Sequence, residues 1–522
     1  AGAHGQSTKV GRVRRELATA GKGATELLDA ATTISLNLTA THPLAQAIET
    51  LGAVAASGKR QLPEGTNNPF GQTWASLVDQ PDREAAFGGY KAATLMLLKR
   101  SLRNGQASVA HSLEHRAPKD RLIPNGQWLK ERARFVRSLA VSAKPEPTIR
   151  WIKDELDIAL KALDAALSRG DIRIENSRLV VPKLKAEPED ENLKSVRRTL
   201  FAGVGKIQLP DLLVEIDAAT RFSWALLGRV PRSEQELIIL YAALIALGSD
   251  LTAADMARMT LDIEADTVGE MMRRIEASDR LPEANRIVLD HFRTLSVTRL
   301  WGGGFHASAD MMSLDATRRL WSARHDPRRR TPAVGTYTHV LDQWAILHNQ
   351  AVVLNRRQAG AAIEGALRHE AVDLHRVAVD THGHTHFGMA LANLVGFDLT
   401  PRLAGMSKRK LYLPRGLDVP ASLKPIVSET VSTRAISRGW VSLLRIAAST
   451  KSGWCSATFV LDRFGSAARG DEAFQAGDAF GRLLLTRFLG AYLGNPAFRR
   501  INDALLSQGE SVHTLPTCDL FR

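Results

Sequence analysis

"VAVDTHGHTHFGMALANLVGF", residues 377–397, predicts a buried strand that leads into a helix. Its first residues are β-branched or small and apolar, which favours a strand inside a sheet. Asp380 follows that strand directly, and His382, His384 and His386 alternate behind it. Ligands and catalytic groups in open α/β sheets gather at the carboxyl ends of strands. Asp380 is therefore a candidate site residue.

Two other interpretations of this stretch remain open. Asp380 could cap the N-terminus of the helix predicted for "THFGMALANLV", a common role for aspartate. The alternating histidines could place three rings on one face of a strand and bind zinc.

The residues around this stretch predict a sheet with helical crossovers. "VGTYTHVLDQWAIL" (334–347) is rich in β-branched and aromatic residues and predicts a strand, "RRQAGAAIEGALRH" (356–369) predicts a helix, and "DLHRVAVD" (373–380) predicts the next strand. Strand, helix and strand in this order are typical of a parallel or mixed α/β sheet. Apolar periodicity predicts mostly helices before residue 205, from 209 to 295, and again after about 416.

The composition of the chain narrows its partners and its compartment. Its 69 Lys and Arg exceed its 55 Asp and Glu, for a formal net charge of +14. This excess favours a polyanionic partner, although a basic enzyme with no such partner remains an alternative. Two cysteines, Cys455 and Cys518, cannot build a disulfide scaffold and indicate a reducing compartment. The longest uncharged run, residues 237–248, is too short to span a membrane, so we expect a soluble cytoplasmic protein.

Two further carboxylates could join Asp380. Asp310 ends "HASAD", and Glu510 lies in "FRRINDALLSQGESVHTL" (498–515), off the apolar stripe of a predicted helix. Three carboxylates would form an oxygen-rich cage for two Mg²⁺ ions, which Mn²⁺ can replace. Paired metals activate the attacking oxygen and stabilise the leaving oxygen in phosphodiester displacement. Spacing alone does not single out these three acids among many Asp and Glu.

Five motifs follow one another along the chain: "KIQLPDLLVEIDAATRFSW" (206–224), "WGGGFHASAD" (301–310), "GTYTHVLDQW" (335–344), "VDTHGHTHFGMALANLVGFDLTPRLAGMSKRKLYLP" (379–414) and "LLSQGESVHTL" (505–515). In this order they resemble the transposases of the Tn-three family, the large replicative DDE transposases of bacterial mobile elements. The resemblance runs from about residue 10 to residue 515.

The resemblance implies a fold and three catalytic acids. It implies an α+β or α/β chain with a ribonuclease H-like catalytic domain that carries a large α-helical insertion. Asp310, Asp380 and Glu510 match the family's catalytic and metal-binding acids, and Asp315 is the nearest competitor for the first position. Oxygen ligands suit magnesium or manganese better than imidazole-bound zinc, so we expect no structural zinc at the histidines.

The resemblance also implies an activity. A metal-bound water would nick each 3′ end of the element, and the freed 3′-OH would attack target DNA. Host replication would then yield a cointegrate, which a resolvase separates. The partners would be double-stranded DNA (terminal inverted repeats and target DNA) and a second copy of the chain in a homodimer, in the bacterial cytoplasm and associated with the nucleoid.

Several basic or histidine side chains are candidates for DNA contact, with a solvated surface or packing as the alternative. They are Arg318, Arg319, Arg328, Arg329, Arg330, His339, His384, Arg402, Lys408, Arg409, Lys410, Arg445 and Lys451. Near three carboxylates, such cations would neutralise DNA phosphates.

The expected domains are a helical region for dimerisation and DNA-end contacts (1–205), a helical connector (206–300), a ribonuclease H-like core (301–415), a helical insertion (416–495), a catalytic helix (496–515) and an aberrant tail (516–522). Family members extend further at the N-terminus, and Pro516 would stop the last helix. Two alternatives therefore stay open: an inactive, truncated DNA-binding remnant, and a nuclease that cuts without joining.

Overall fold

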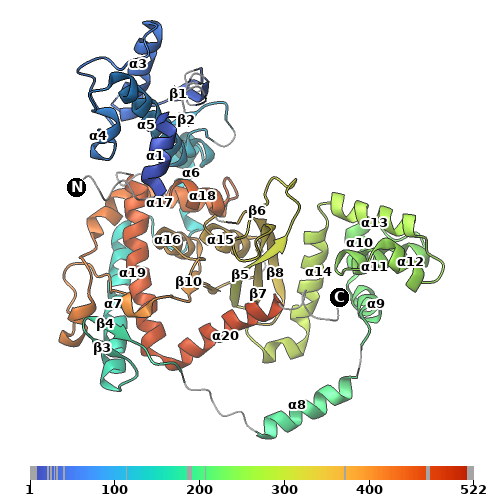
Figure 1. Cartoon of the computed structure of the whole chain (residues 1–522). Coiled ribbons are helices and arrows are strands. Elements are labelled where there is room, and N and C mark those ends of the chain that lie inside the picture. Colours follow the sequence, from blue (N-terminus) through green and yellow to red (C-terminus); the bar gives the residue numbers. More distant parts are fainter. Residues whose placement is uncertain are drawn as a thin grey trace. The chain divides into compact units, whose positions relative to one another are not determined.

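Figure 1 shows the computed structural model of the chain. Its residue contacts divide it into two compact units. The first unit comprises residues 1–139 and 434–478, and the second comprises 140–433 and 479–522. The description leaves out residues 1–8, 20–22, 24, 25, 29, 31, 32, 39, 40, 113, 114, 185–190, 206, 355, 369–371, 466–470 and 514–522. The expected tail, 516–522, lies outside the described residues.

The first unit is mainly helical. It contains α1 (Lys9–Thr19), α3 (Pro43–Ala56), α4 (Gln72–Val78), α5 (Arg83–Arg103), η1 (Pro118–Arg121), α6 (Asn125–Arg137), most of α17 (Thr433–Lys451) and α18 (Ala457–Arg463). Two short strands, β1 (Leu36–Asn37) and β2 (Ser108–Val109), pair antiparallel.

Hydrogen bonds join the two segments of the first unit across more than 300 residues of sequence. The backbone N–H of Ile123 donates to Ser449 Oγ (3.0 Å), and Arg445 Nε donates to Ile123 O (2.8 Å). Arg463 Nη1 donates to Leu102 O (2.7 Å). Residues 434–478, which we expected inside an insertion of the catalytic domain, thus form one compact unit with residues 1–139.

The second unit is built around a mixed sheet. Its strands are β5 (His306–Asp315), β6 (Arg324–His325), β7 (Pro332–Leu341), β8 (Ile346–Val352), β9 (Arg376–Val379) and β10 (Asp398–Pro401). They lie in the order β10-β9-β5-β7-β6, and β8 also pairs with β7. β9 runs parallel to β5 and β10, whereas β7 runs antiparallel to β5 and β8. The predicted α/β sheet is present, and the chain is a mixed α and β protein.

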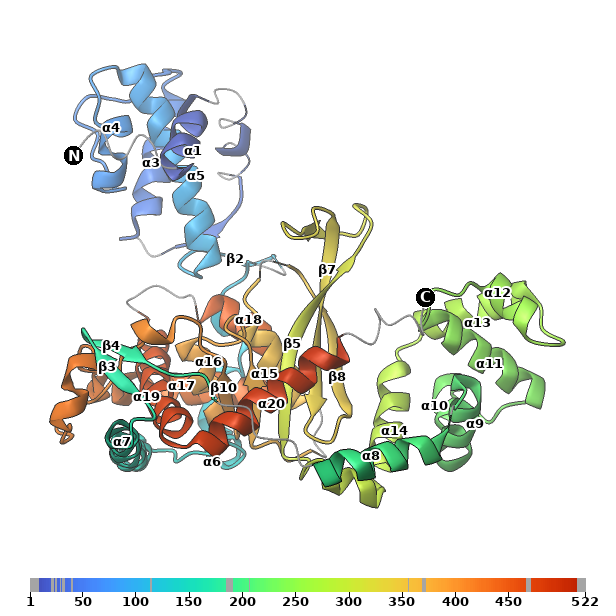
Figure 2. The same ribbon diagram turned by 60° about the horizontal axis from the view of Figure 1, so that its bottom comes forward.

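Helices cover both faces of this sheet. α15 (Ala359–Leu367) lies on one face. Its Gly365 is so close to the ring of His339 that a Cβ added to Gly365 would lie 2.1 Å from His339 Cε1. α16 (His386–Val395) packs beside α15. α20 (Pro496–Val512) lies on the other face, where Leu505 and Leu506 cluster with Ala378 (Figure 2).

The other elements of the second unit are mostly helical. They are α7 (Pro145–Ser168), the hairpin β3 (Arg173–Glu175) and β4 (Arg178–Val180), α8 (Glu191–Val204), α9 (Leu209–Thr220), α10 (Phe222–Leu227), α11 (Glu234–Leu247), α12 (Ala253–Met259), α13 (Ala265–Ala277), α14 (Leu281–Thr294), η2 (Ser296–Leu300), η3 (Met406–Lys408), η4 (Ala421–Ile426) and α19 (Glu472–Gly494), which begins in the first unit. Helices α10–α13 share one apolar core. Among the described residues, no helix is both long enough and apolar enough to cross a membrane.

Candidate active site

Strand register brings Asp310 and Asp380 side by side. The parallel pairing of β5 with β9 matches Ala309 to Val379, and the pairing of β9 with β10 matches Val379 to Pro401. The next residues along these strands are Asp310, Asp380 and Arg402. The backbone N–H of Arg402 donates to Val379 O (2.8 Å), which extends the ladder by one bond. Asp380 and Arg402 therefore directly follow β9 and β10, and Asp310 lies level with them within the longer strand β5.

Both aspartates face α20. Ser308 and Ala378, two positions earlier on their strands, contact this helix: Leu505 and Leu506 pack with Ala378, and a Cβ on Gly509 would lie 2.7 Å from Ser308 Oγ. Side chains two residues apart on a strand share a face. Asp310 and Asp380 thus lie on the face that α20 covers.

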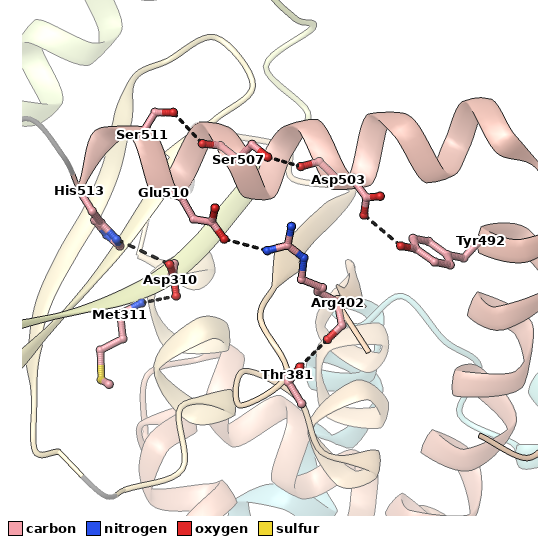
Figure 3. Close-up of polar contacts among 10 residues, drawn as sticks. All are labelled: Asp310, Met311, Thr381, Arg402, Tyr492, Asp503, Ser507, Glu510, Ser511 and His513. Carbon is pink, nitrogen blue, oxygen red and sulfur yellow. Dashed lines mark hydrogen bonds and ion pairs between the residues drawn. The ribbon is translucent and has the colours of Figure 1, made fainter. Parts of the chain in front are cut away.

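The end of α20 adds Glu510 and His513 to this edge (Figure 3). Glu510 Oε1 accepts a hydrogen bond from Arg402 Nη1 (2.8 Å), and the two side chains are 55% and 48% exposed. His513 Nδ1 lies 3.6 Å from Asp310 Oδ2. The structure thus brings all three predicted acids to the same edge, with an arginine and a histidine among them.

Asp310 is electrostatically crowded. Burial raises the pKa of its carboxyl group, and the nearby charges of Asp380 and Glu510 raise it further. A hydrogen bond from the Met311 N–H (2.8 Å) and the proximity of His513 act in the opposite direction. A cation bound among these carboxylates would relieve their repulsion and favour the charged form of Asp310.

Asp380 has a role other than helix capping. Its Oδ1 accepts hydrogen bonds from the backbone N–H groups of His382 (2.9 Å) and Gly383 (2.8 Å). The N-cap of α16 is Thr385, whose Oγ1 accepts from the Gly388 N–H (2.9 Å). The N-cap interpretation of Asp380 is therefore wrong. Its carboxylate instead holds the turn that follows β9.

The three histidines lie in this turn and at the start of α16, and not on one face of a strand. His382 is exposed, and His386 packs its ring 5.6 Å from that of Tyr412. His384 is partly buried, and burial lowers its pKa to about 4. Among the described residues, no group of three or more His, Cys, Asp or Glu is arranged to hold a metal ion. Asp310, Asp380 and Glu510 offer suitable oxygen donors, but Glu510 is bound to Arg402 instead.

The predicted DNA-contact residues have different surroundings. Arg318, Arg319, Arg328, Arg329 and Arg330 are exposed in the loop between β5 and β7, and Lys408 is exposed in η3. Arg409 donates to Ala404 O, and Lys410 Nζ donates to Ser177 O and Pro425 O (3.1 Å each), so these two cations also hold the backbone. Arg445 and Lys451 belong to the first unit.

His339 is fully buried. Its Nε2 lies 2.8 Å from Ala362 O, and burial lowers its pKa to about 4. These facts favour packing over DNA contact as the role of His339. Asp315, the competitor of Asp310, accepts a hydrogen bond from Thr331 Oγ1 (2.6 Å) in the loop between β5 and β7.

Sequence reasoning missed His513 and the partner of Glu510. The spacing of Glu510 and His513, three residues apart on one helix, is a signal that could have placed His513 beside the acids. The Arg402–Glu510 pair joins residues 108 positions apart and has no local signal.

Comparison with known proteins identifies relatives. Residues 211–518 match the family model described as the Tn3 transposase DDE domain. The chain is 39% identical over 490 residues to the transposase for insertion sequence element IS1071 in transposon Tn5271 of Comamonas testosteroni, covering 94% of this chain and 50% of that protein. It is 26% identical to the transposase for transposon Tn1546 of Enterococcus faecium, covering 92% of this chain and 49% of that protein. The chain spans about half the length of the curated relatives it matches.

Proposed function

Because the chain belongs to the Tn3 family of DDE transposases, as its motifs predicted, we propose that it nicks the 3′ ends of a mobile element and joins them to target DNA. The observation that carries this proposal is the convergence of Asp310, Asp380 and Glu510 at one edge of the sheet, from β5, β9 and α20. Nicking and joining are both phosphodiester displacements, so one set of acids can serve both steps.

We propose that the sheet and its helices form a ribonuclease H-like core. Three antiparallel strands in succession, β5, β7 and β8, are followed by two strands parallel to β5 and by α20 across one face. This arrangement supports the assignment because it places two acids on neighbouring central strands. The third acid comes from a helix that follows a long, mostly helical segment.

A DDE transposase domain implies a divalent metal, and we propose two Mg²⁺ ions, which Mn²⁺ can replace. Asp310, Asp380 and Glu510 would hold them, because carboxylate oxygens are the donors that Mg²⁺ prefers. When bound, such ions lower the pKa of a water nucleophile and stabilise the leaving oxygen. The chain itself holds Asp380 by two backbone N–H groups and places Asp310 opposite it in register.

Metal binding by Glu510 competes with its ion pair to Arg402. The 2.8 Å hydrogen bond between them occupies a carboxylate oxygen, and the positive charge of Arg402 repels a cation at the same edge. Once released, the Arg402 guanidinium would lie at the carboxyl end of β10, where it can bind a DNA phosphate. We therefore propose that metal and DNA binding open this ion pair together.

We propose that double-stranded DNA runs along the β5–β7 hairpin. β5 and β7 pair along nearly their whole length, whereas β9 ends opposite Ala309, so the hairpin continues as an arm beyond β9 and β10 (Figure 2). β8 accompanies β7 along this arm as far as Gly335. The exposed arginines of residues 318–330 lie at its far end. Phosphates passing along the arm would meet these charges first and the acids afterwards.

A homodimer, association with the nucleoid and later action of a resolvase remain proposals from the family resemblance. The competing function is a nuclease that cuts without joining. Both functions need the acids, so only the fate of the 3′-OH distinguishes them.

The test incubates the chain with Mg²⁺ and labelled duplexes that carry the ends of the element encoding it, together with a target plasmid. We expect nicks at the 3′ ends and labelled DNA joined to the plasmid. Nicks without joined product would favour the nuclease. An absence of both products in Mg²⁺ and in Mn²⁺ would contradict the proposed enzyme.

A further inference from the structure

An exposed tryptophan stands among the arginines at the tip of the β5–β7 arm. The Trp321 side chain is 76% exposed, and the neighbouring Leu320 is 41% exposed. Within the described residues, no ring or cation in contact with the Trp321 indole is seen. Burying an aromatic side chain of this size is strongly favourable, so this exposed indole is available to contact a partner with a flat apolar face.

The loop that carries Trp321 has a well-defined frame. Asp326 is only 7% exposed and accepts hydrogen bonds from Ser313 Oγ (2.6 Å) and from the Arg328 N–H (2.8 Å). Arg324 Nη1 donates to the carbonyl oxygen of Trp321 (2.7 Å). These bonds hold the backbone of the tip in place. The exposure of the indole therefore follows from the fold of the loop.

The charges around Trp321 indicate the chemistry of its partner. Within residues 318–330 the sequence has six arginines and one aspartate, and the aspartate is the buried Asp326. These charges and the indole favour a partner that is an anion and also offers a flat apolar face. Nucleic acid combines both, because each nucleotide carries a phosphate and a base.

We propose that Trp321 stacks on an unpaired base of DNA that is bound along the arm. Leu320 would fill part of the space that the displaced base leaves, and the arginines would bind the flanking phosphates. In an intact duplex the bases are stacked on each other, so the indole needs a base that has left the stack. The ligand class is therefore DNA with a locally opened base pair.

The arm sets the distance between this base and the acids, and here the inference rests on the proposed function. β5 continues for five residues from Asp310 to Asp315, which spans roughly 17 Å at about 3.3 Å per residue. Trp321 lies beyond Asp315 along the loop. DNA advances about 3.4 Å per base pair, so the opened pair would lie about five or more base pairs from the nick.

The test measures binding of the chain to two 30-bp duplexes that differ at one position. One is fully paired with 2-aminopurine, and the other carries the same 2-aminopurine as a single-base bulge. We expect about tenfold tighter binding of the bulged duplex, with stacking seen as quenched 2-aminopurine fluorescence. Trp321→Ala should remove both the preference and the quenching and leave binding of the paired duplex nearly unchanged.

Trp344 supplies the matched control. It is 49% exposed and follows β7 at the opposite end of the same hairpin, so Trp344→Ala should keep the preference. Trp321→Phe should restore part of it. Equal binding of both duplexes by the wild-type chain would overturn the inference, and so would a preference that survives Trp321→Ala. The inference would also be wrong if the only effect of Trp321→Ala were a loss of self-association. Binding of neither duplex would contradict DNA binding itself and thus the proposed function.

Discussion

Arg402 and Glu510 form the contact on which the chemistry of the edge depends. The ion pair is about half exposed and joins the end of β10 to α20. Surface ion pairs contribute little to stability, so this one can open at a small cost. The ion pair weakens cation binding, because Arg402 occupies one oxygen of Glu510 and its positive charge repels a metal ion at the same edge.

We predict that Arg402→Gln binds Mn²⁺ about tenfold more tightly than the wild-type chain. The substitution frees Glu510 and removes one positive charge within a few ångströms of the site. Electron paramagnetic resonance of free Mn²⁺, without DNA, measures this affinity. Arg409→Gln is the matched control, because Arg409 bonds Ala404 O and no carboxylate contact is seen for it in the described residues. An unchanged or weaker Mn²⁺ affinity in Arg402→Gln would contradict the competition.

We predict that Asp310→Asn, Asp380→Asn and Glu510→Gln each remove nicking and joining. Each substitution deletes one negative ligand and nearly preserves shape, so DNA binding should persist. Gel assays of nicking and filter binding measure the two properties separately. Asp315→Asn serves as the control, because Asp315 holds Thr331 in the loop and should be dispensable for cleavage. Nicking at the wild-type rate by any of the three variants would show that its residue is not catalytic.

His339 predicts a pH dependence of stability. Burial lowers its folded-state pKa from 6.5 to about 4, so the unfolded chain binds a proton more readily between these values. The contribution of neutral His339 to the free energy of unfolding is fully present above pH 6.5. It falls by on the order of 3 kcal/mol as the pH drops toward 4. Urea unfolding at pH 7.5 and pH 5 measures the loss, which should be smaller in His339→Gln. An equal loss in both proteins would contradict the prediction.

The position of α20 is set by a close approach to β5. Gly509 contacts Ser308 so tightly that a Cβ would lie 2.7 Å from Ser308 Oγ and 3.3 Å from its Cβ. Glu510 follows directly on the same helix, and Gln508 on its other side donates to Leu341 O (2.9 Å). The close packing of Gly509 on Ser308 thus contributes to the position of the third acid.

We predict that Gly509→Ala lowers stability by about 1–3 kcal/mol and slows nicking, because the added methyl group pushes α20 away from the sheet. Ser308→Ala removes the oxygen that the methyl group would meet, so the double variant should recover much of both losses. Thermal unfolding and nicking rates measure the effects. A double variant as impaired as Gly509→Ala alone would show that this contact does not position Glu510.

The basic charge is unevenly distributed along the chain. Residues 100–139 and 434–465, both in the first unit, carry 14 Lys and Arg against 4 Asp and Glu. The chain has a net charge of +14, so these two segments supply most of the excess. The bonds of Ile123 to Ser449 and Arg445, and of Arg463 to Leu102, join the two segments.

We predict that the triple variant Lys119→Gln, Arg438→Gln and Lys451→Gln weakens DNA binding and lowers its salt dependence. The three side chains are exposed in the first unit, and each DNA phosphate that is no longer neutralised should reduce the slope of log K against log salt by about 0.9. Fluorescence anisotropy from 50 to 200 mM salt measures the slope. Arg173→Gln, Arg258→Gln and Arg286→Gln, each paired with a carboxylate, should leave it unchanged. If the triple variant kept the wild-type slope, these three side chains would not contact the DNA.

Local patterns in the sequence predicted the elements that hold the acids. The apolar run before Asp380 forms β9, and "THFGMALANLV" forms α16 with Thr385 as its cap. Strand and helix periodicities depend on neighbouring residues, so they are visible in sequence alone. Together with the family motifs, they placed Asp310, Asp380 and Glu510 on two strands and a late helix.

The partners that these elements meet depend on the three-dimensional fold. It paired Glu510 with Arg402, buried His339 under α15, and joined residues 434–478 to residues 1–139. Each result depends on how faces of distant elements close over one another. Such contacts depend on shape and burial across hundreds of residues, and no local spacing or periodicity encodes them.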